Sequence, residues 1–362
     1  MEAFTEEPVR GSYGDFSWVK YAGIETARRF VQGTFPRPPI HHLVGLTPTE
    51  AGIGSMTFSM PVTEWLQDGS GIIWGGIYAM LADAPISVSL LTGLPPGKAL
   101  TTSELSINYL RPPTLNSGTL VGRGRSVYLG REVGVAEATV EDSQGRTMAH
   151  ATTRCVVLDV PIDENAQPAS AKPKEYDSID PYLRDVPGDA KFGPEIWNEN
   201  KLDVQRKFIE GDLEKSPIQK LTGLRFVQAD EGSCSLTIPA SPWFSAGSPF
   251  IYGGVLAFAC DSALSGAVWS TLDADAVAAS LDLQIRFLRP VPLDDRPITI
   301  KSSVRHSGRT IRVAEAEAFD ADGRRVAIAT GSSMVIPGGV GKLKQGLTAE
   351  EIVSNYAKDS GS

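Results

Sequence analysis

One apolar run decides the fold of this chain: Gly75-Gly76-Ile77-Tyr78-Ala79-Met80-Leu81-Ala82-Asp83. It stays apolar to residue 91, and a helix that is apolar on every side must be buried on every side. The run returns 178 positions later (261 − 83) as Gly253-Gly254-Val255-Leu256-Ala257-Phe258-Ala259-Cys260-Asp261. We therefore expect two buried helices, over residues 75–91 and 253–269, each opened by two glycines and each carrying one aspartate.

The rest of the chain repeats at the same offset without a gap. The matching pairs include Trp65 with Trp243, Leu110-Arg111-Pro112 with Leu288-Arg289-Pro290, and Gly130-Arg131 with Gly308-Arg309. Solenoid repeats are roughly 20–50 residues long, so a period of this length indicates duplicated domains. The sequence predicts two copies of one domain fused head to tail.

Composition shifts place the domain boundaries. We expect a first domain with a helical lead-in over residues 1–158, a linker over 159–195, a second domain over 196–340 and a C-terminal tail over 341–362. The linker is rich in Pro, Asp, Lys and Ala, most clearly at residues 166–173, which is typical of a solvated connection. Helix is expected to resume near residues 197–210, and weakly in the tail around 348–356.

Strand patterns surround each apolar run. Residues 54–62 alternate weakly before the first helix, and residues 281–287 alternate strictly after the second, as do 105–109 one repeat earlier. Three more strand candidates follow in each copy, separated by turns at Gly130, residues 143–145, Gly308 and residues 321–323. One strand, one buried helix and about four antiparallel strands describe an α+β domain in which a sheet wraps around a helix.

Charge and cysteine content narrow the possible partners and compartment. The formal net charge of −9 argues against general binding to nucleic acid or to an anionic membrane. The apolar run at residues 253–270 carries Asp261 and several glycines, so it reads as a buried helix rather than a membrane span. The widely spaced Cys155, Cys234 and Cys260 favour free, buried thiols in a reducing compartment. With no signal peptide visible, we expect a cytoplasmic protein.

This order of elements resembles the hotdog fold, and its motifs resemble the acyl-CoA thioesterases of the phenylacetate-pathway (PaaI-like) type. That family carries His-Gly-Gly and an Asp seven residues after the second Gly, as the spacings 83 − 76 and 261 − 254 reproduce here. Its next strand often carries an early Ser or Thr, here Thr102 and Ser280, and ends as Tyr109-Leu110-Arg111-Pro112 and Phe287-Leu288-Arg289-Pro290 do. The resemblance implies two hotdog domains packed as an intrachain pseudo-dimer, an acyl-CoA substrate, and no cofactor or metal.

The sequence departs from the family pattern on the oxyanion side. Trp74 and Tyr252 stand where the family has its His, and Asp68 and Ala246 stand six residues earlier, where the family often has Asn. Trp74 and Tyr252 are expected either to line an acyl pocket or to plug it.

The conserved part of the motif contains the groups that thioester hydrolysis requires. Helix-initial N–H groups lack intrahelical partners and lie at the positive end of the helix dipole, where they can stabilise an oxyanion. A carboxylate can attack the thioester or activate a water. The resemblance implies two composite sites, one pairing Asp83 and Thr102 with Gly253, the other pairing Asp261 and Ser280 with Gly75. The expected substrate-binding residues are Trp74, Tyr252, Gly76, Gly254, Asp68, Arg111 and Arg289.

Each assignment has a structural alternative. A buried aspartate can be a hydrogen-bonded core group, glycines allow close helix–sheet packing, and Ser and Thr are common in strands. The arginines before proline can bind CoA phosphates or simply be solvated. For the whole protein, the alternative to a thioesterase is a non-catalytic acyl-CoA or aromatic-ligand binding protein, and a hotdog hydratase is a more distant one. The chain is also a possible homodimer.

Other hydrolase and ligand-binding classes lack their signatures. The sequence contains no G-x-S-x-G nucleophile elbow and no phosphate-binding glycine loop between a strand and a helix. The four histidines do not repeat between the copies, which disfavours a histidine-dependent zinc site and the Asp–His pair of hotdog hydratases; they are His41, His42, His150 and His306.

Overall fold

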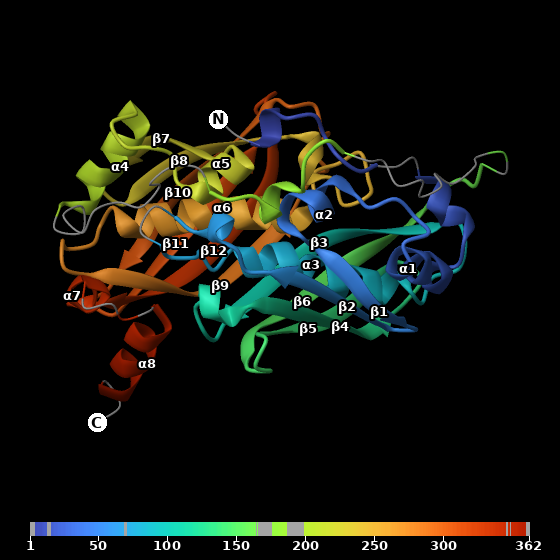
Figure 1. The fold of residues 1–362 in the computed structure, drawn as a ribbon, viewed down its shortest axis with the longest axis horizontal. Helices are drawn as coiled ribbons and strands as arrows, with labels where there is room; N and C mark the ends of the chain where they lie inside the picture. Colours follow the sequence, from blue (N-terminus) through green and yellow to red (C-terminus); the bar gives the residue numbers. More distant parts are fainter. Residues whose placement is uncertain are drawn as a thin grey trace.

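A computed structural model describes residues 4–12, 16–68, 71–163, 165, 176–186, 199–344, 347 and 349–359 (Figure 1). Within it, each half of the chain lays one long helix on an antiparallel sheet. The two sheets join edge to edge into one 12-stranded sheet. The predicted α+β architecture of two hotdog domains, packed as an intrachain pseudo-dimer, is confirmed.

The two halves meet at the centre of the sheet. The strands of the first half are β1 Thr47–Gly52, β2 Ser55–Pro61, β3 Lys98–Tyr109, β4 Thr119–Leu129, β5 Val133–Glu141 and β6 Thr147–Asp159. Those of the second are β7 Arg225–Asp230, β8 Ser233–Pro239, β9 Val277–Phe287, β10 Pro297–Ser307, β11 Ile311–Phe319 and β12 Arg325–Ile336. Their order is β1-β2-β4-β5-β6-β3-β9-β12-β11-β10-β8-β7, so β3 and β9 join the halves as an antiparallel pair.

Each half has one strand more than the sequence predicted. The structure places a hairpin, β1–β2 or β7–β8, before each long helix, where only one strand was expected. Gly54 and Gly232 make the hairpin turns at φ 74° and 75°, a conformation that glycine adopts readily. The first strand of each hairpin forms an edge of the sheet, where half-exposed polar residues leave no apolar alternation to detect.

Two buried helices carry the repeated motif. They are α3 Ile77–Leu91 and α6 Gly253–Trp269, which pack against each other on the same face of the sheet (Figure 1). Helix α6 begins where the sequence predicted. Helix α3 begins two residues later than predicted, with Gly76 as its N-cap, so the two glycine pairs occupy different positions relative to their helix ends.

Shorter helices surround this core. They are α1 Gly23–Val31, α2 Pro39–Val44, α4 Lys201–Glu210, α5 Pro217–Thr222, α7 Gly339–Lys344 and α8 Ala349–Asp359. Helix α4 is the expected lead-in to the second copy, capped by Asn200, and α8 is the expected helix of the tail. The predicted linker, residues 159–195, is described in part: its most clearly linker-like stretch, 166–173, lies outside the described residues, whereas Asp180 forms an ion pair with Arg10 and a hydrogen bond with His42. The domain boundaries at residues 158, 195 and 340 stay a prediction.

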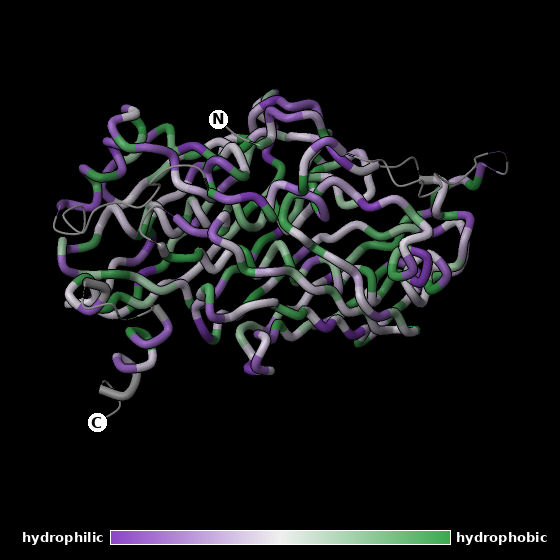
Figure 2. The backbone as a smooth tube through the Cα atoms, viewed as in Figure 1, coloured by the Kyte–Doolittle hydropathy of each residue, from purple (hydrophilic) through white to green (hydrophobic). Residues whose placement is uncertain are grey.

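The main hydrophobic cluster includes residues from both halves, which makes the pseudo-dimer one folded body. In Figure 2 hydrophobic segments concentrate along the central helices and strands, while hydrophilic segments gather on peripheral loops and helices. The three cysteines are free and buried, as predicted. Among the described helices, none has both the length and the apolar character that crossing a membrane requires.

Candidate active site

The two motif aspartates cross over to the opposite helix. Oδ2 of Asp83 lies 2.8 Å from the point that a Cβ on Gly253 would occupy, and Oδ2 of Asp261 lies 3.1 Å from the equivalent point on Gly76. A side chain at either glycine would therefore displace the carboxylate of the other half. The structure thus brings Asp83 to Gly253, as the resemblance implied, but it brings Asp261 to Gly76 rather than to Gly75.

Asp83 accepts hydrogen bonds from two hydroxyl groups of its own half. Its Oδ1 accepts from the hydroxyls of Ser87 and Thr102 at 3.3 and 3.2 Å, and these two hydroxyls lie 3.2 Å apart. Burial raises the pKa of Asp83 to about 6, and the Thr102 hydroxyl, the Gly254 N–H and the Ser87 hydroxyl each lower it. The raised value means that the loss of hydration outweighs these three donors.

Tyr252 fills the space beside Asp83. It is 8% exposed, and its hydroxyl donates to the carbonyl of Met80 at 2.9 Å. A Cβ on Gly254 would lie 2.7 Å from the Tyr252 ring, so the ring is packed directly against the start of α6. Whether Tyr252 lines or plugs an acyl pocket stays a prediction.

Asp261 is paired differently, because its main donor comes from the other half. Its Oδ1 accepts from the Tyr109 hydroxyl at 3.1 Å, while its Oδ2 is buried without a hydrogen-bond partner. Burial raises the pKa of Asp261 to about 7; the Tyr109 hydroxyl and the Gly76 N–H lower it, and the charge of Asp282 raises it. The raised pKa means that burial outweighs these two donors, and a buried carboxyl group with a perturbed pKa is a candidate for a reactive group.

Ser280 does not contact Asp261 as the resemblance implied. Its hydroxyl is instead 3.3 Å from that of Ser265, one turn along α6 from Asp261. Oδ1 of Asp261 accepts from Tyr109 instead. At the other site the residue equivalent to Tyr109 is Phe287, which has no hydroxyl, so Thr102 reaches Asp83 unopposed.

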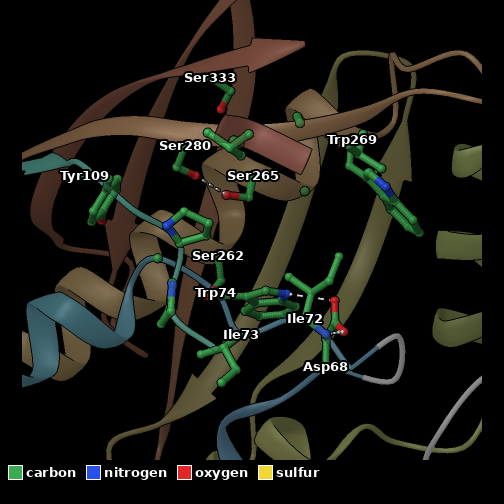
Figure 3. A pocket seen from close by; sticks show the side chains of 18 of the residues that line it. Asp68, Ile72, Ile73, Trp74, Tyr109, Ser262, Ser265, Trp269, Ser280 and Ser333 are labelled. Carbon is green, nitrogen blue, oxygen red and sulfur yellow. Dashed lines mark hydrogen bonds between the residues drawn. The ribbon is translucent and has the colours of Figure 1, made fainter. Parts of the chain in front are cut away.

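A cavity of about 290 Å³ lies between the two halves, with Tyr109, the hydrogen-bond donor to Asp261, in its wall (Figure 3). Its wall includes Trp74, Gly75 and Tyr109 from the first half, and Ser265 and Ser280 from the second. Helix α8 contributes to the wall as well, and its Glu350 forms an ion pair with Arg146 at 2.7 Å. Asp261 is only 2% exposed and is not part of the cavity wall.

Trp74 lines this cavity and does not fill it. Its indole N–H donates to Oδ2 of Asp68 at 3.1 Å, and its ring stacks on Phe258 with the centroids 6.2 Å apart. Oδ1 of Asp68 accepts from the backbone N–H of Ile72 at 3.0 Å, which fixes the carboxylate. The Trp74 N–H is thus already occupied and does not point freely at a substrate.

Arg111 and Arg289 each form a hydrogen bond to the backbone of a neighbouring strand. The guanidinium of Arg111 donates to the carbonyl of Thr147, and that of Arg289 donates to the equivalent carbonyl of Arg325. Arg111 also belongs to the cavity wall, whereas Arg289 does not. A role for either residue in binding CoA phosphates stays a prediction.

Ser87, Ser265 and Tyr109 were not singled out from the sequence. The two serines lie four residues after the motif aspartates, a spacing that places them on the same helix face and could have found them. Tyr109 gave no such signal, because its partner Asp261 lies in the other half and its own repeat counterpart is Phe287.

Comparisons with known proteins agree with this geometry. The sequence model of the thioesterase superfamily matches the chain twice, at residues 70–149 and 249–327. A candidate esterase from Saccharolobus solfataricus is 30% identical over 132 residues, which cover 36% of this chain and 91% of that protein. A candidate esterase from Halobacterium salinarum is 33% identical over 102 residues, 27% of this chain and 66% of that protein.

Two solved structures share the complete arrangement. The acyl-CoA thioesterase II of Mycobacterium marinum matches at a TM-score of 0.50 and 15% identity, over 82% of this chain and 97% of that one. The tesB protein of Mycobacterium avium subsp. paratuberculosis matches at 0.51 and 11%, over 87% and 100%. Fold and repeated motif define a tandem hotdog protein. The chain belongs to the thioesterase superfamily.

The motif glycines predict an order of tolerance to alanine. A Cβ at Gly254 would lie 2.6 Å from the backbone oxygen of Ala79, one at Gly76 would meet the Asp261 carboxylate at 3.1 Å, and one at Gly75 would meet only the Tyr109 ring edge at 3.4 Å. Backbone atoms move less easily than side chains, so Gly254→Ala should lower the free energy of unfolding most, by about 1–3 kcal/mol. Gly76→Ala should lower it by a smaller amount, and Gly75→Ala should have the smallest effect. Urea unfolding of the three variants measures the order, and equal losses would contradict it.

Proposed function

We propose that this protein hydrolyses an acyl-CoA thioester to the free acid and CoA, at the composite site formed by Asp261 and the Gly75–Gly76 pair. One arrangement carries the proposal: the buried Asp261 carboxylate lies against Gly76 of the opposite half and accepts from Tyr109, whose side chain and Gly75 form part of a cavity wall. Membership of the thioesterase superfamily supports hydrolysis of a thioester. That the thioester is an acyl-CoA is part of this proposal.

The glycine pair is proposed to stabilise the negative charge that develops on the thioester oxygen. Gly75 lies in the cavity wall just before α3, at the positive end of the helix dipole. The N–H groups of the first α3 residues donate to the carbonyls of Trp74, Gly75 and Gly76, so the N–H of Gly75 is the one proposed to face the substrate. As the thioester carbonyl becomes tetrahedral, its oxygen gains negative charge that such N–H groups stabilise. Loss of one donor of this kind typically costs about 10²- to 10³-fold in rate.

Asp261 supplies the base. A pKa of about 7 keeps roughly half of the carboxyl ionised at neutral pH, with enough proton affinity to accept a proton from water. The activated water adds to the carbonyl carbon, and collapse of the tetrahedral intermediate breaks the C–S bond. CoA leaves as the thiolate and takes the proton back.

The two composite sites are unequal in this proposal. Tyr252 occupies the approach to Asp83, and three donors already lie around the Asp83 carboxylate. The cavity lies on the Asp261 side, where Trp74 leaves space that Tyr252 fills at the other site. Asp83 therefore serves the structure, and Asp261 serves the reaction.

One observation favours a second function, the binding of an acyl-CoA or aromatic ligand without turnover. The Trp74 N–H is bonded to Asp68 and so cannot replace the family's His as a donor to substrate. Tyr109 also separates Asp261 from the cavity. A binding protein would use the aromatic wall and leave the carboxylate unused.

Release of free CoA thiol from short, medium, long and aryl acyl-CoA esters separates the two functions. The proposal expects at least one ester to be hydrolysed well above the spontaneous rate. Binding of an ester, seen by calorimetry, without thiol release over hours would establish the binding protein instead.

The pH dependence of the rate follows from the pKa of Asp261. Only the ionised carboxylate can accept a proton, so the rate should rise through a midpoint near pH 7 and level off above it. Initial rates between pH 5.5 and 8.5, corrected for spontaneous hydrolysis, measure this limb. A rate independent of pH over this range would exclude Asp261 as the base.

A further inference from the structure

We propose that Tyr109 is a catalytic proton relay, which connects the buried carboxylate of Asp261 to a water in the cavity. The inference rests on the proposed function and assigns a role to a residue that the sequence identified only as part of a strand-end motif. It addresses a mismatch in the site: the base is 2% exposed and absent from the cavity wall, yet it must act on a water in that cavity.

Tyr109 contacts both the buried Asp261 and the cavity. Its hydroxyl donates to Oδ1 of Asp261 at 3.1 Å, while its side chain forms part of the cavity wall next to Gly75. A phenolic oxygen that donates one hydrogen bond can still accept another. A water in the cavity can therefore donate to Tyr109 while Tyr109 donates to Asp261.

The ring is held in place for this task. A Cβ on Gly75 would lie 3.4 Å from the Tyr109 ring, so a glycine at this position leaves room for the ring beside the oxyanion donors. Tyr78 packs against the other side with the centroids 6.0 Å apart, and its own hydroxyl is anchored on the carbonyl of Arg111 at 2.9 Å. The relay hydroxyl is thus close to where the thioester carbonyl would lie.

The repeat gives this inference an internal comparison. Both halves keep the aspartate and the glycine pair, but the equivalent of Tyr109 is Phe287, whose ring tip lies 3.5 Å from the Cβ position of Gly253. The Asp83 site therefore has the same ring without the hydroxyl, and it also lacks the space that Tyr252 fills. At the Asp261 site the Tyr109 hydroxyl and the described cavity occur together.

The step balances in protons and electrons. The water gives a proton to the Tyr109 oxygen as the Tyr109 hydroxyl proton passes to Oδ1 of Asp261, and the water oxygen forms its bond to the carbonyl carbon. The carbonyl π pair moves to the oxygen facing the Gly75 N–H. When the C–S bond breaks, the thiolate receives the proton by the reverse path, which restores Tyr109 and Asp261.

The surroundings favour a concerted transfer over a tyrosinate intermediate. Burial and the neighbouring Asp261 raise the pKa of Tyr109 well above 10. The neighbouring ionisable groups are Asp282 on β9, Tyr78 on α3 and Cys260 on α6, and the guanidinium of Arg111, which also belongs to the cavity wall, donates to the carbonyl of Thr147. Because the pKa of Tyr109 is raised, the proposed relay moves both protons together.

Tyr109→Phe tests the relay, because Phe287 shows that the fold accommodates the ring alone. We expect kcat to fall by roughly 10²-fold or more while KM changes little, since the lost group acts on the water in the transition state. The residual rate should also rise with pH at a higher midpoint than in the wild type, because the lost hydroxyl lowers the pKa of Asp261. An unchanged or increased kcat would overturn the relay and make Tyr109 a cover over Asp261.

The double variant Tyr109→Phe, Phe287→Tyr moves the hydroxyl to the other composite site. The relay predicts that the rate stays as low as in Tyr109→Phe; recovery would show that the hydroxyl works at Asp83 and would overturn the assignment. A proton inventory on the wild type in H₂O–D₂O mixtures needs no variant at all. A relay expects the curved dependence of two protons in flight, and a linear one contradicts it.

These outcomes separate the relay from the function beneath it. A wild type that releases no thiol from any ester overturns both. A wild type that is active, with Tyr109→Phe equally active, overturns the relay alone and leaves the thioesterase standing.

Discussion

Asp261→Asn is expected to lower the rate of thioester hydrolysis by roughly 10²- to 10⁴-fold, the contribution typical of a positioned general base. The amide keeps the size of the carboxyl group and can still accept a hydrogen bond from Tyr109, so the cavity and the glycine pair should keep their shape. What it loses is the ability to accept a proton. Initial rates of thiol release on the most active ester measure the effect, with KM expected to change far less than kcat.

Asp83→Asn is the matched control for this substitution, because Asp83 is equally buried on the equivalent helix. Since Tyr252 fills its site, the rate should fall far less than in Asp261→Asn. Equal losses in the two variants would show two working sites, and a loss confined to Asp83→Asn would reverse the assignment.

The same two substitutions are expected to stabilise the protein at alkaline pH. Burial raises the pKa of Asp261 from 3.8 to about 7 and that of Asp83 from 3.8 to about 6. Below pH 3.8 each carboxyl is protonated in the folded and unfolded states, and its contribution to stability is fully present. As the pH rises through the folded-state value, that contribution is lost, because the unfolded chain ionises more easily.

The expected size follows from those values. One pKa unit corresponds to about 1.4 kcal/mol, so ionisation costs the folded state about 4 kcal/mol at Asp261 and about 3 kcal/mol at Asp83 above pH 8. Asparagine removes this cost. Urea unfolding at pH 4 and pH 8.5 should show each variant gaining stability over the wild type at the higher pH by up to these amounts. A gain that does not change with pH would contradict the buried titration.

Much of the fold follows from the repeat. The apolar runs at residues 75–91 and 253–269 predict the two buried helices because only a fully enclosed helix can be apolar on every side. The sequence did not predict the edge strands β1 and β7. An edge strand is largely exposed to solvent, so its sequence needs no alternation of apolar residues. The start of α3 at Ile77, two residues later than predicted, could not be read from the apolar run because both glycines continue it.

The site was less predictable because its halves are not equivalent. The resemblance gave the crossed pairing of aspartate and glycine, but it treated Thr102 and Ser280 as alike. The two sites differ because Tyr109 has a hydroxyl group and its repeat equivalent, Phe287, has none. The hydroxyl contacts Asp261, which lies 152 positions later in the sequence, so the sequence alone did not reveal this contact. Trp74 and Tyr252 likewise occupy equivalent positions, yet one lines a cavity and the other fills the corresponding space, as their different partners, Asp68 and Met80, require.

The most direct test of the working site is a crystal structure with an acyl-CoA analogue in which a methylene group replaces the thioester sulfur. This ketone keeps the carbonyl but cannot be hydrolysed. The acyl group is expected in the cavity beside Trp74, with the ketone oxygen facing the Gly75 N–H and the carbonyl carbon near Tyr109. An analogue bound instead between Asp83 and Gly253, with Tyr252 displaced, would contradict the account.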